Sequence, residues 1–526
     1  MYLVMYDISG IQKFIFATGK LKEQMGGSNI IHKIMYECLP KVLGREVKEY
    51  DAWKNKDYKP DEFFHEKKGN VVYIGGGNAM ALFKDDKTME EINRDMQKEV
   101  YKLTAGNIRL CYAAVEIENL DIKGEGYGKV YEELMSKMAV FKREHTAVST
   151  VRGFSINAQD VNTLEPVIVN YDVKNKKEVA CAASIFQKNQ HKYRNMGKLE
   201  KYNLADQFDE YFKSDDKKSF LAIIHIDGNS MGKKIQSFIK SIDDKPGNTI
   251  RESLKHMKLL SMEIDSIYEN ALIETLDQVY EYEINNTMDE KPLPFRVIIR
   301  DGDDLTIVMD AGRTFKFVDV YMQKLGEEVE KNKELYPEID GSKIKVSAGA
   351  GVTFVHNKFP FDMAYDYAEQ LCKSAKTGLR ELSEKGSIPE DTSCMDFQII
   401  RSGMTSEIAR YRKEKYTFSY EEKEYKLNAR PYFFTDSRSI IQHRYNDFKE
   451  IINKILSGDI ARNKLKELRN SYSLGMYETK NCYRRILSRN KEGISGDKSK
   501  EVFSTDNVAI YFDALDVIDL MEENNA

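Results

Sequence analysis

Residues 220–228 read FLAIIHIDG, and residues 295–310 read FRVIIRDGDDLTIVMD. The first stretch is an apolar strand that ends near Asp227, and the second is a pair of strand-like arms around a turn that contains Asp303 and Asp304. Asp-Gly is a strong hairpin signal, because glycine adopts the positive φ that a tight turn requires. We therefore expect a strand and a hairpin whose acidic ends meet at one edge of a sheet.

The elements around these strands follow a regular order. Residues 251–283 predict a long helix before the hairpin, residues 314–332 a helix after it, and residues 343–355 a further strand. Apolar residues at helical spacing then predict a helix over 361–382. This βαββαβ order is that of a ferredoxin-like domain, in which an antiparallel sheet carries its helices on one face.

The same order occurs nearer the N-terminus. A strand at 1–7 ends in Asp7, a hairpin at 71–84 follows, and helix, strand and helix continue as far as residue 143. The hairpin turn at 75–78 reads GGGN and has no carboxylate. One acid cannot hold two cations, so we expect this half to lack catalysis. Its glycine-rich turn can still approach a nucleotide closely.

The chain of 526 residues is too long for a single core. We expect an α+β protein with two βαββαβ domains and a C-terminal helical domain. The predicted divisions are a first domain at 1–148, a polar connector of unassigned structure at 149–218, a second domain at 219–394 and a helical domain at 395–526.

Composition limits the classes of function. A net charge of −5 argues against the large basic excess of proteins that neutralise long nucleic acids. The six cysteines are scattered without a CxxC pair, so no zinc is expected. The N-terminus is unlike a signal peptide and no long apolar run is present, so we expect a cytoplasmic protein without a membrane segment.

Three convergent carboxylates suit phosphoryl transfer, which needs divalent metals to screen charge and to align the attacking and leaving oxygens. Asp227, Asp303 and Asp304 are the candidate catalytic residues and the candidate ligands of two Mg²⁺ or Mn²⁺ ions. The alternative interpretation of DGDD is an ordinary hairpin turn, because turns favour the same residue types. Gly228 and Asn229 at the matching strand end weaken that alternative.

Other polar residues are weaker candidates. Lys373 and Lys376 lie one helical turn apart and could bind phosphate, Lys376 more plausibly, although such pairs are commonly solvated. His225 shares a strand face with Asp227, but a lone histidine in an apolar strand is more often packed than catalytic.

These motifs resemble the large palm-domain subunit of type III CRISPR-Cas effector complexes, the cyclic oligoadenylate synthase of the Csm and Cmr assemblies. RDGDD is similar to that family's GGDD catalytic turn, and HIDGNSMG to its second-palm aspartate strand. The other similar segments are DISGIQKFIF, LKEQMGGSNII, VVYIGGGNAMALF, SAGAGVTFVHNKFPFDMAYDYAEQLCKSAK, LNARPY and IARNKLKELRNSY.

The resemblance implies that two ATP molecules bind between the two palm domains, a donor at the second and an acceptor at the first. The 3′-hydroxyl of one attacks the α-phosphate of the other, pyrophosphate leaves, and ring closure gives a cyclic oligonucleotide. By that analogy four residues line the acceptor side: Ser28, Gly76, Gly77 and Asn78. The candidate nucleotide-binding residues at the second palm are Gly228, Asn229, Gly302 and Lys376.

The sequence also departs from the family pattern. The turn begins Asp301-Gly302 where the family has Gly-Gly, and Asn229 stands where many relatives carry a second Asp. The family's HD nuclease domain and its cysteine-rich zinc module are missing, so DNA cleavage is not expected.

Two competing functions remain. The first is a non-catalytic scaffold of a type III effector complex that binds RNA and partner subunits, and retention of all three acids disfavours it. The second is a GGDEF-like diguanylate cyclase, which commonly works as a homodimer of single palms, unlike two unequal palms in one chain. The sequence leaves open the nucleotide base, the ring size, homo-oligomerisation, and any need for guide RNA and effector subunits.

Overall fold

The structure is a computed structural model of the 526-residue chain. All structural statements below concern the residues that it describes, which are 1–18, 21–44, 69–75, 77–104, 106–121, 126–144, 156, 158–160, 166–167, 169–173, 176–180, 197–205, 211, 220–286, 292–331, 346–401, 407–490, 493–494 and 501–521.

The first sheet has four antiparallel strands in the order β2-β3-β1-β4. Counted along the chain this is the order 4-1-3-2 of a ferredoxin-like domain, as the sequence predicts. The strands are β1 (Tyr2–Ser9), β2 (Gly69–Gly75), β3 (Asn78–Phe83) and β4 (Arg109–Glu116). The helices of this half are α1 (Ile11–Ile15), α2 (Leu21–Lys33), a π-helical turn at Ile34–Cys38, α3 (Leu39–Val42), α5 (Asp86–Thr104) and α6 (Gly126–Glu144).

The second sheet has six strands in the order β14-β11-β10-β7-β9-β8. Its last four repeat the 4-1-3-2 order, so the predicted α+β fold class is confirmed. The strands are β7 (Phe220–Gly228), β8 (Phe295–Asp301), β9 (Asp304–Asp310), β10 (Ala348–His356), β11 (Cys394–Ile399) and β14 (Tyr432–Phe433). Its helices are α8 (Met231–Asp243), α9 (Ile250–Val279), α10 (Glu281–Asn286), α11 (Thr314–Lys331) and α12 (Phe361–Glu384).

Two expected boundaries are wrong. A division between residues 394 and 395 would cut β11, which pairs in parallel with β10 and so belongs to the second sheet. The long helix expected over 251–283 ends at Val279, and α10 starts separately at Glu281, because Tyr280 leaves the helical conformation and its ring is buried.

The helices cover both faces of each sheet, and not one face as predicted. On β1, Val4 and Tyr6 belong to the buried cluster that includes residues of α2 and α5, whereas Leu3 and Met5 belong to the cluster that includes α6 and α9. In the second sheet, α12 packs on β10 and β7 while α9 and α11 pack against each other within the other cluster. The last helix of each half thus adds a layer to the basic βαββαβ unit.

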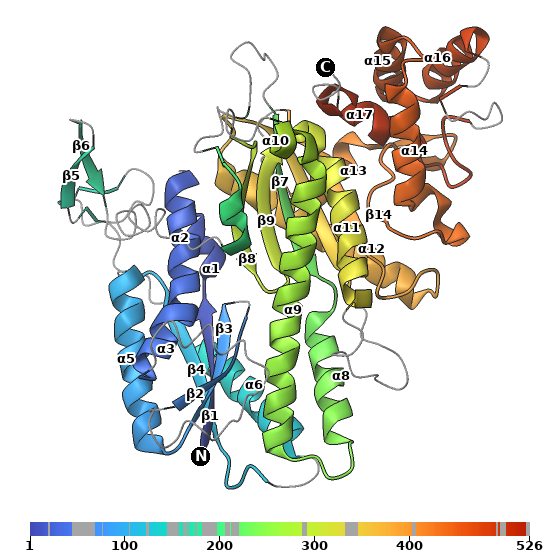
Figure 1. Ribbon diagram of the computed structural model, residues 1–526. Helices are drawn as coiled ribbons and strands as arrows, with labels where there is room; N and C mark the ends of the chain where they lie inside the picture. The colour runs from blue at the N-terminus through green and yellow to red at the C-terminus, as the bar shows by residue number, and fades with distance from the viewer. Residues whose placement is uncertain are drawn as a thin grey trace.

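The C-terminal part is mainly helical and lies beside one end of the second sheet (Figure 1). It contains one short hairpin besides its helices. Its elements are α13 (Ile408–Lys415), β12 (Thr417–Tyr420), β13 (Lys423–Lys426), α14 (Tyr445–Leu456), α15 (Arg462–Ser471), α16 (Met476–Arg489) and α17 (Phe512–Met521). The described part of the expected connector includes β5 (Val169–Val173) and β6 (Lys176–Ala180). None of the helices in the described ranges is both long and apolar enough to cross a membrane.

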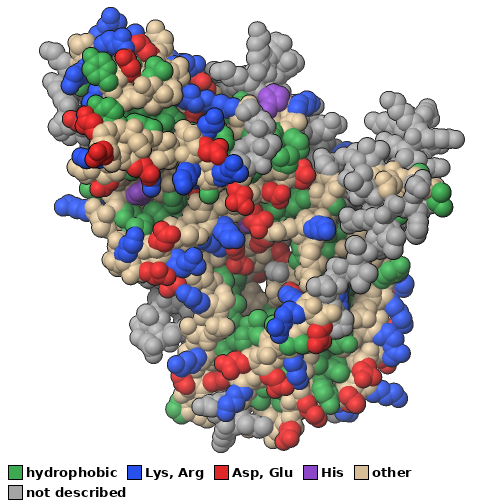
Figure 2. Space-filling view, turned by 180° about the vertical axis from the view of Figure 1, so that it is seen from behind, with side chains coloured by type: hydrophobic (Ala, Val, Ile, Leu, Met, Phe, Trp, Pro, Cys, Tyr) green, Lys and Arg blue, Asp and Glu red, His purple; other side chains and the backbone are tan. Residues whose placement is uncertain are grey.

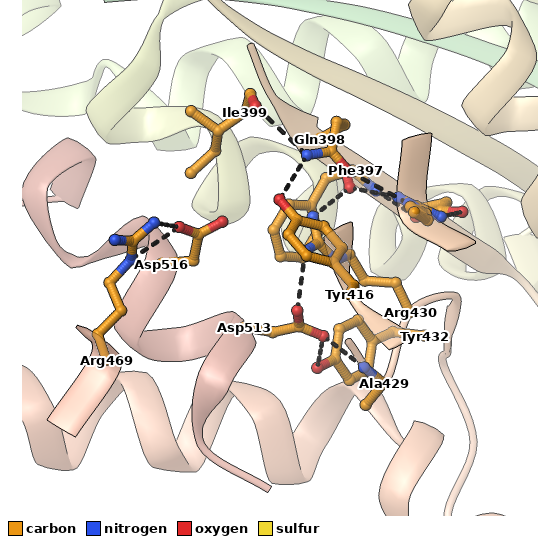
Figure 3. A network of polar contacts seen from close by, with 12 residues as sticks. Phe397, Gln398, Ile399, Tyr416, Ala429, Arg430, Tyr432, Arg469, Asp513 and Asp516 are labelled. Atoms are coloured by element: carbon orange, nitrogen blue, oxygen red, sulfur yellow. Dashed lines mark hydrogen bonds and ion pairs between the residues drawn. The ribbon is translucent and has the colours of Figure 1, made fainter. Parts of the chain in front are cut away.

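A buried ionic network attaches this part to the second sheet (Figure 3). Arg430 lies 2.9 Å from Asp513 of α17, and both side chains are almost fully buried. Asp513 also accepts hydrogen bonds from the Ala429 amide and the Tyr432 hydroxyl, and Arg430 donates to the carbonyl of Phe397 in β11. The LNARPY segment therefore joins α17 to the sheet.

The two βαββαβ halves pack against each other. One hydrophobic cluster contains residues of both, including Val4 and Ile34 from the first half and Ile223 and Tyr365 from the second. Polar contacts add to it: the Ile74 carbonyl accepts from Ser261 of α9 at 3.1 Å. Seen from behind, the surface is hollowed between the two halves, with Asp and Glu side chains gathered along the hollow (Figure 2).

The close packing of α12 on β10 gives a testable prediction. A Cβ atom at Gly351 of β10 would overlap backbone atoms of Ala368 and Cys372 of α12. Gly351→Ala therefore forces the helix away from the sheet, and we expect it to lower the free energy of unfolding by about 2 kcal/mol in denaturant titrations.

Gly326 is the matched control, because it lies exposed in α11 and a Cβ there would meet nothing within 4 Å. Gly326→Ala should raise stability by about 0.5–1 kcal/mol through helix propensity. Equal effects of the two substitutions would contradict the described packing.

Candidate active site

Strand pairing brings the three predicted acids to one sheet edge. Strand β7 lies between β9 and β10, with Ile226 opposite Leu305 and Asp227 opposite Gly349. Asp303 follows Gly302, whose φ of +60° suits glycine, and Asp304 begins β9. Asp227, which follows Ile226, therefore lies beside Asp304 at the start of β9.

Burial and neighbouring carboxylates raise the pKa of Asp303 and of Asp304. The pKa of Asp303 is raised to about 6, first by its removal from water and then by the charge of Asp227. That of Asp304 is raised well above its usual range by the same two causes, with Asp303, Asp301 and Glu369 adding to the repulsion. The Oδ1 atom of Asp304 is enclosed and has no hydrogen-bond partner. Concentrated negative charge of this kind favours a cation.

Lys376 supplies the nearest positive charge. Its ammonium group, on α12, contacts the carboxylate of Asp227 and donates to the Gly228 carbonyl at 2.7 Å. The side chain reaches them across β10 at Gly349, where a Cβ atom would lie 2.8 Å from Lys376 Cγ. A side chain at residue 349 would therefore obstruct this path. Lys373, the other candidate on this helix, is exposed.

Gly228 and Asn229 shape the end of β7. A Cβ atom at Gly228 would lie 2.6 Å from Asp303 Oδ2, so the absence of a side chain lets that carboxylate approach the strand. Asn229 is buried, and its side-chain amide donates to Ser347 Oγ at 3.0 Å and to the Thr392 carbonyl at 3.1 Å. Asn229 therefore ties the strand end to neighbouring segments in this structure.

Burial lowers the pKa of two basic side chains near these acids, His225 and Lys234. His225 is buried and its Nδ1 lies 3.2 Å from Thr306 Oγ1; burial lowers its pKa to about 4, so the ring is neutral at physiological pH. The His225 side chain is therefore packed in the core, as expected from the sequence. Burial also lowers the pKa of Lys234, on α8, to about 8, and acids that include Glu390 and Asp303 partly offset this effect.

The acceptor-side candidates lie in the first half. Ser28 is buried in α2, and α2 contacts β8 of the second half. Asn78 pairs with Asp7 across β1 and β3. Gly76 lies outside the described residues. The amide of Gly77 donates to the Asp301 carboxylate at 2.7 Å, which directly links the GGGN and DGDD turns.

Asp7 lies near the end of β1 but does not cap the helix that follows it. The N-cap of α1 is Gly10, which has no side-chain cap. The Asp7 carboxylate instead contacts Lys142 of α6.

The donor set is compatible with a hard divalent cation. All three acids offer carboxylate oxygens, and Asp304 Oδ1, which lies 3.4 Å from His225 Nδ1, has no hydrogen-bond partner. Within the described ranges, no three His, Cys, Asp or Glu side chains stand close enough to enclose an ion by themselves. Magnesium sites in nucleotide enzymes commonly combine one or two carboxylates with substrate phosphates, so a protein cage is not required.

Sequence reasoning missed three residues at this site. Gly349 has no local signal, because a glycine inside a strand is read only as a weak point of the strand. Lys234 looks like one more surface lysine of a charged helix. Asp301 was noted only as a departure from the family turn, and its partner Gly77 is 224 residues away.

Comparison with known proteins gives a family and a fold. A search of curated protein sequences finds no match. Solved structures with similar folds include the apo Csm1–Csm4 cassette (TM-score 0.53, 14% identity, covering 99% of this chain and 70% of that chain), the same cassette in complex with one ATP (0.53, 13%, 99% and 70%) and Csm1 of T. onnurineus (0.50, 14%, 99% and 69%). Residues 220–383 match the family described as Cas10/Cmr2, second palm domain. Residues 220–383 are therefore a Cas10/Cmr2-type second palm domain, and the chain shares the fold of Csm1.

Proposed function

We propose that the chain is a metal-dependent nucleotidyltransferase that converts ATP to cyclic oligoadenylates and releases pyrophosphate. The observation that carries the proposal is the strand register that gathers Asp227, Asp303 and Asp304 at one edge of a Cas10/Cmr2-type palm. The fold is shared with Csm1–Csm4 cassettes in complex with ATP and with pppApA, at 13% identity. The product would act as a second messenger in antiviral defence.

The residues of the second palm have separate proposed roles. Asp227, Asp303 and Asp304 would hold two Mg²⁺ or Mn²⁺ ions, which when bound screen the triphosphate and align the attacking and leaving oxygens. Lys376 would bind the donor phosphates as a mobile point charge. Gly228 keeps Asp303 close to β7, since no side chain intervenes.

The first palm would hold the acceptor nucleotide, with Ser28, Gly77, Asn78 and the undescribed Gly76 around it. This assignment rests on family resemblance and on the contact between the two hairpin turns. The acceptor needs no metal of its own, because the metal ions at the second palm serve both reactants.

The partners are proposed from the same fold similarity. Csm1 is found with Csm4 in the cassettes, so we propose a Csm4-like subunit and guide RNA as partners in a cytoplasmic effector complex. The second candidate function is a scaffold in that complex without catalysis. Purified protein incubated with each labelled NTP and Mg²⁺ or Mn²⁺, with products identified by mass spectrometry, separates the two. The scaffold alternative requires that no product forms, with or without partner subunits.

The first prediction of this proposal concerns the turn acids. We expect the Asp303→Ala, Asp304→Ala double variant to fold normally but to lose product formation by about a thousandfold, equivalent to about 4 kcal/mol of transition-state stabilisation. Metal-free thermal stability should not fall, because the substitutions relieve repulsion. Product mass spectrometry and thermal melting measure the two effects.

Glu421 and Glu422 provide the control. They are an exposed acidic pair in the turn of another hairpin, between β12 and β13. Glu421→Ala, Glu422→Ala should retain full activity. Wild-type product yield from the Asp303, Asp304 variant would refute the site.

The second prediction compares the first acids of the two palms. Asp227→Ala should abolish product formation, because it removes a metal ligand. Asp7→Ala should lower stability by about 1 kcal/mol through loss of the Lys142 contact and reduce activity only mildly. Product assays and metal-dependent ATP binding test both variants. Complete loss of chemistry in both, with folding intact, would show that the first palm is itself catalytic.

The third prediction concerns pH. The folded pKa of Asp303, about 6, lies above its unfolded value near 3.8, so ionisation costs more in the folded state and stability is lost as the pH rises through this window. Metal-free Asp303→Asn should therefore melt higher than wild type at pH 7.5, and this advantage should shrink towards pH 5. Exposed Glu421→Gln is the control. An advantage for Asp303→Asn that grows on acidification would contradict this prediction.

A further inference from the structure

One contact between the palms joins the two turns on which the proposed function depends. The Asp301 carboxylate, at the end of β8, accepts a hydrogen bond from the Gly77 amide at 2.7 Å. A carboxylate acceptor makes such a bond stronger than a bond between neutral groups. The DGDD turn therefore places a negative charge directly on the backbone of the GGGN turn.

Other contacts besides this bond hold the palms together. They share a hydrophobic cluster, and other polar contacts cross between them at separate places. Ser261 donates to Ile74 at 3.1 Å, the Gly128 amide donates to Asp243 at 2.6 Å, and Arg251 pairs with Asp121 at 3.0 Å. The position of the Gly77–Asp301 hydrogen bond between the two hairpin turns therefore suggests a further role for it.

The amide that Asp301 occupies is the type that binds anions. Gly77 has a φ of +72°, and a Cβ atom there would clash with the side chain of Ile11, so the position is confined to glycine. Amides of glycine-rich turns bind phosphate because no side chain shields them. One N–H group in this geometry cannot serve the Asp301 carboxylate and a phosphate oxygen at once.

Asp301 also adds unfavourable charge to a crowded site. Its carboxylate is among the groups that raise the pKa of Asp304. The acid thus has an electrostatic cost at the proposed metal site.

We propose that Asp301 is an intramolecular anion that occupies the Gly77 amide in the nucleotide-free protein and competes with the phosphates of the acceptor nucleotide. The proposal rests on the proposed function, because it assumes that an anionic ligand enters between the turns. Binding of that ligand must release Asp301 from Gly77. Acceptor binding and the position of the DGDD turn are thereby coupled.

The test measures anion binding without metal or chemistry. Inorganic pyrophosphate is titrated calorimetrically into metal-free wild type, Asp301→Gly and Asp301→Asn. We expect Asp301→Gly to bind about tenfold more tightly than wild type, and Asp301→Asn, which keeps an acceptor oxygen without the charge, to bind with intermediate affinity. Hydrogen exchange at the Gly77 amide should be fastest in Asp301→Gly.

Glu369→Gln is the matched control for charge alone. Glu369 on α12 also raises the pKa of Asp304, but the Gly77 amide donates to Asp301 and not to Glu369. Its removal should change pyrophosphate affinity far less. Equal gains in Glu369→Gln and Asp301→Gly would overturn the proposal, as would pyrophosphate affinities of Asp301→Gly and Asp301→Asn no higher than that of wild type.

Failure of the proposed function would be seen separately. Product assays with ATP and Mg²⁺ on the same variants report on catalysis, whereas the titrations report on competition at Gly77. A wild type that forms no product with or without partner subunits, together with tighter pyrophosphate binding in Asp301→Gly, would refute the nucleotidyltransferase and retain the competing anion. If Asp301→Gly does not fold, Asp301→Asn alone decides, since its affinity must still exceed that of wild type.

Discussion

The antiparallel pairing of β7 with β9 on one side and β10 on the other is the constraint on which the site depends. Side chains alternate along a strand, so a shift of one residue in this register would move each apolar residue of β7 into the cluster on the opposite face of the sheet. The burial of Ile224 and Ile226 thus fixes where Asp227 emerges. Hydrophobic packing well inside the sheet determines the spacing of charges at its edge.

Glycines allow neighbouring groups to approach the strands of this site closely. At Gly228, Gly349 and Gly351 a neighbouring carboxylate, a lysine and a helix respectively occupy the space that a Cβ atom would need. The site is therefore built by close approach of backbone to side chain. The glycines place no side chain of their own beside the clustered carboxylates. A large, charged ligand such as a metal-bound triphosphate can therefore approach the backbone.

The sequence was sufficient for the order of the elements and for the three acids, because alternating apolar strands, hairpin turns and helical spacing are local signals. It was insufficient for β11 and β14, since a six-residue strand and a two-residue strand are defined by partners elsewhere in the chain. The contact between Asp301 and Gly77 depends on how two domains pack, which no local pattern encodes. Nucleotide binding by the candidate residues remains a prediction.

The buried pair of Arg430 and Asp513 has a consequence for how the polypeptide can be shortened. Asp513 is the counter-ion of a guanidinium that has no access to water, and it lies 84 positions after Ala429, whose amide it also binds. Removing one member of a buried pair leaves an uncompensated charge, at a cost of about 3–5 kcal/mol. A recombinant fragment that contains Arg430 but stops before α17 would carry that charge against β11, two strands from Asp227. A recombinant fragment that contains Arg430 should therefore also contain α17.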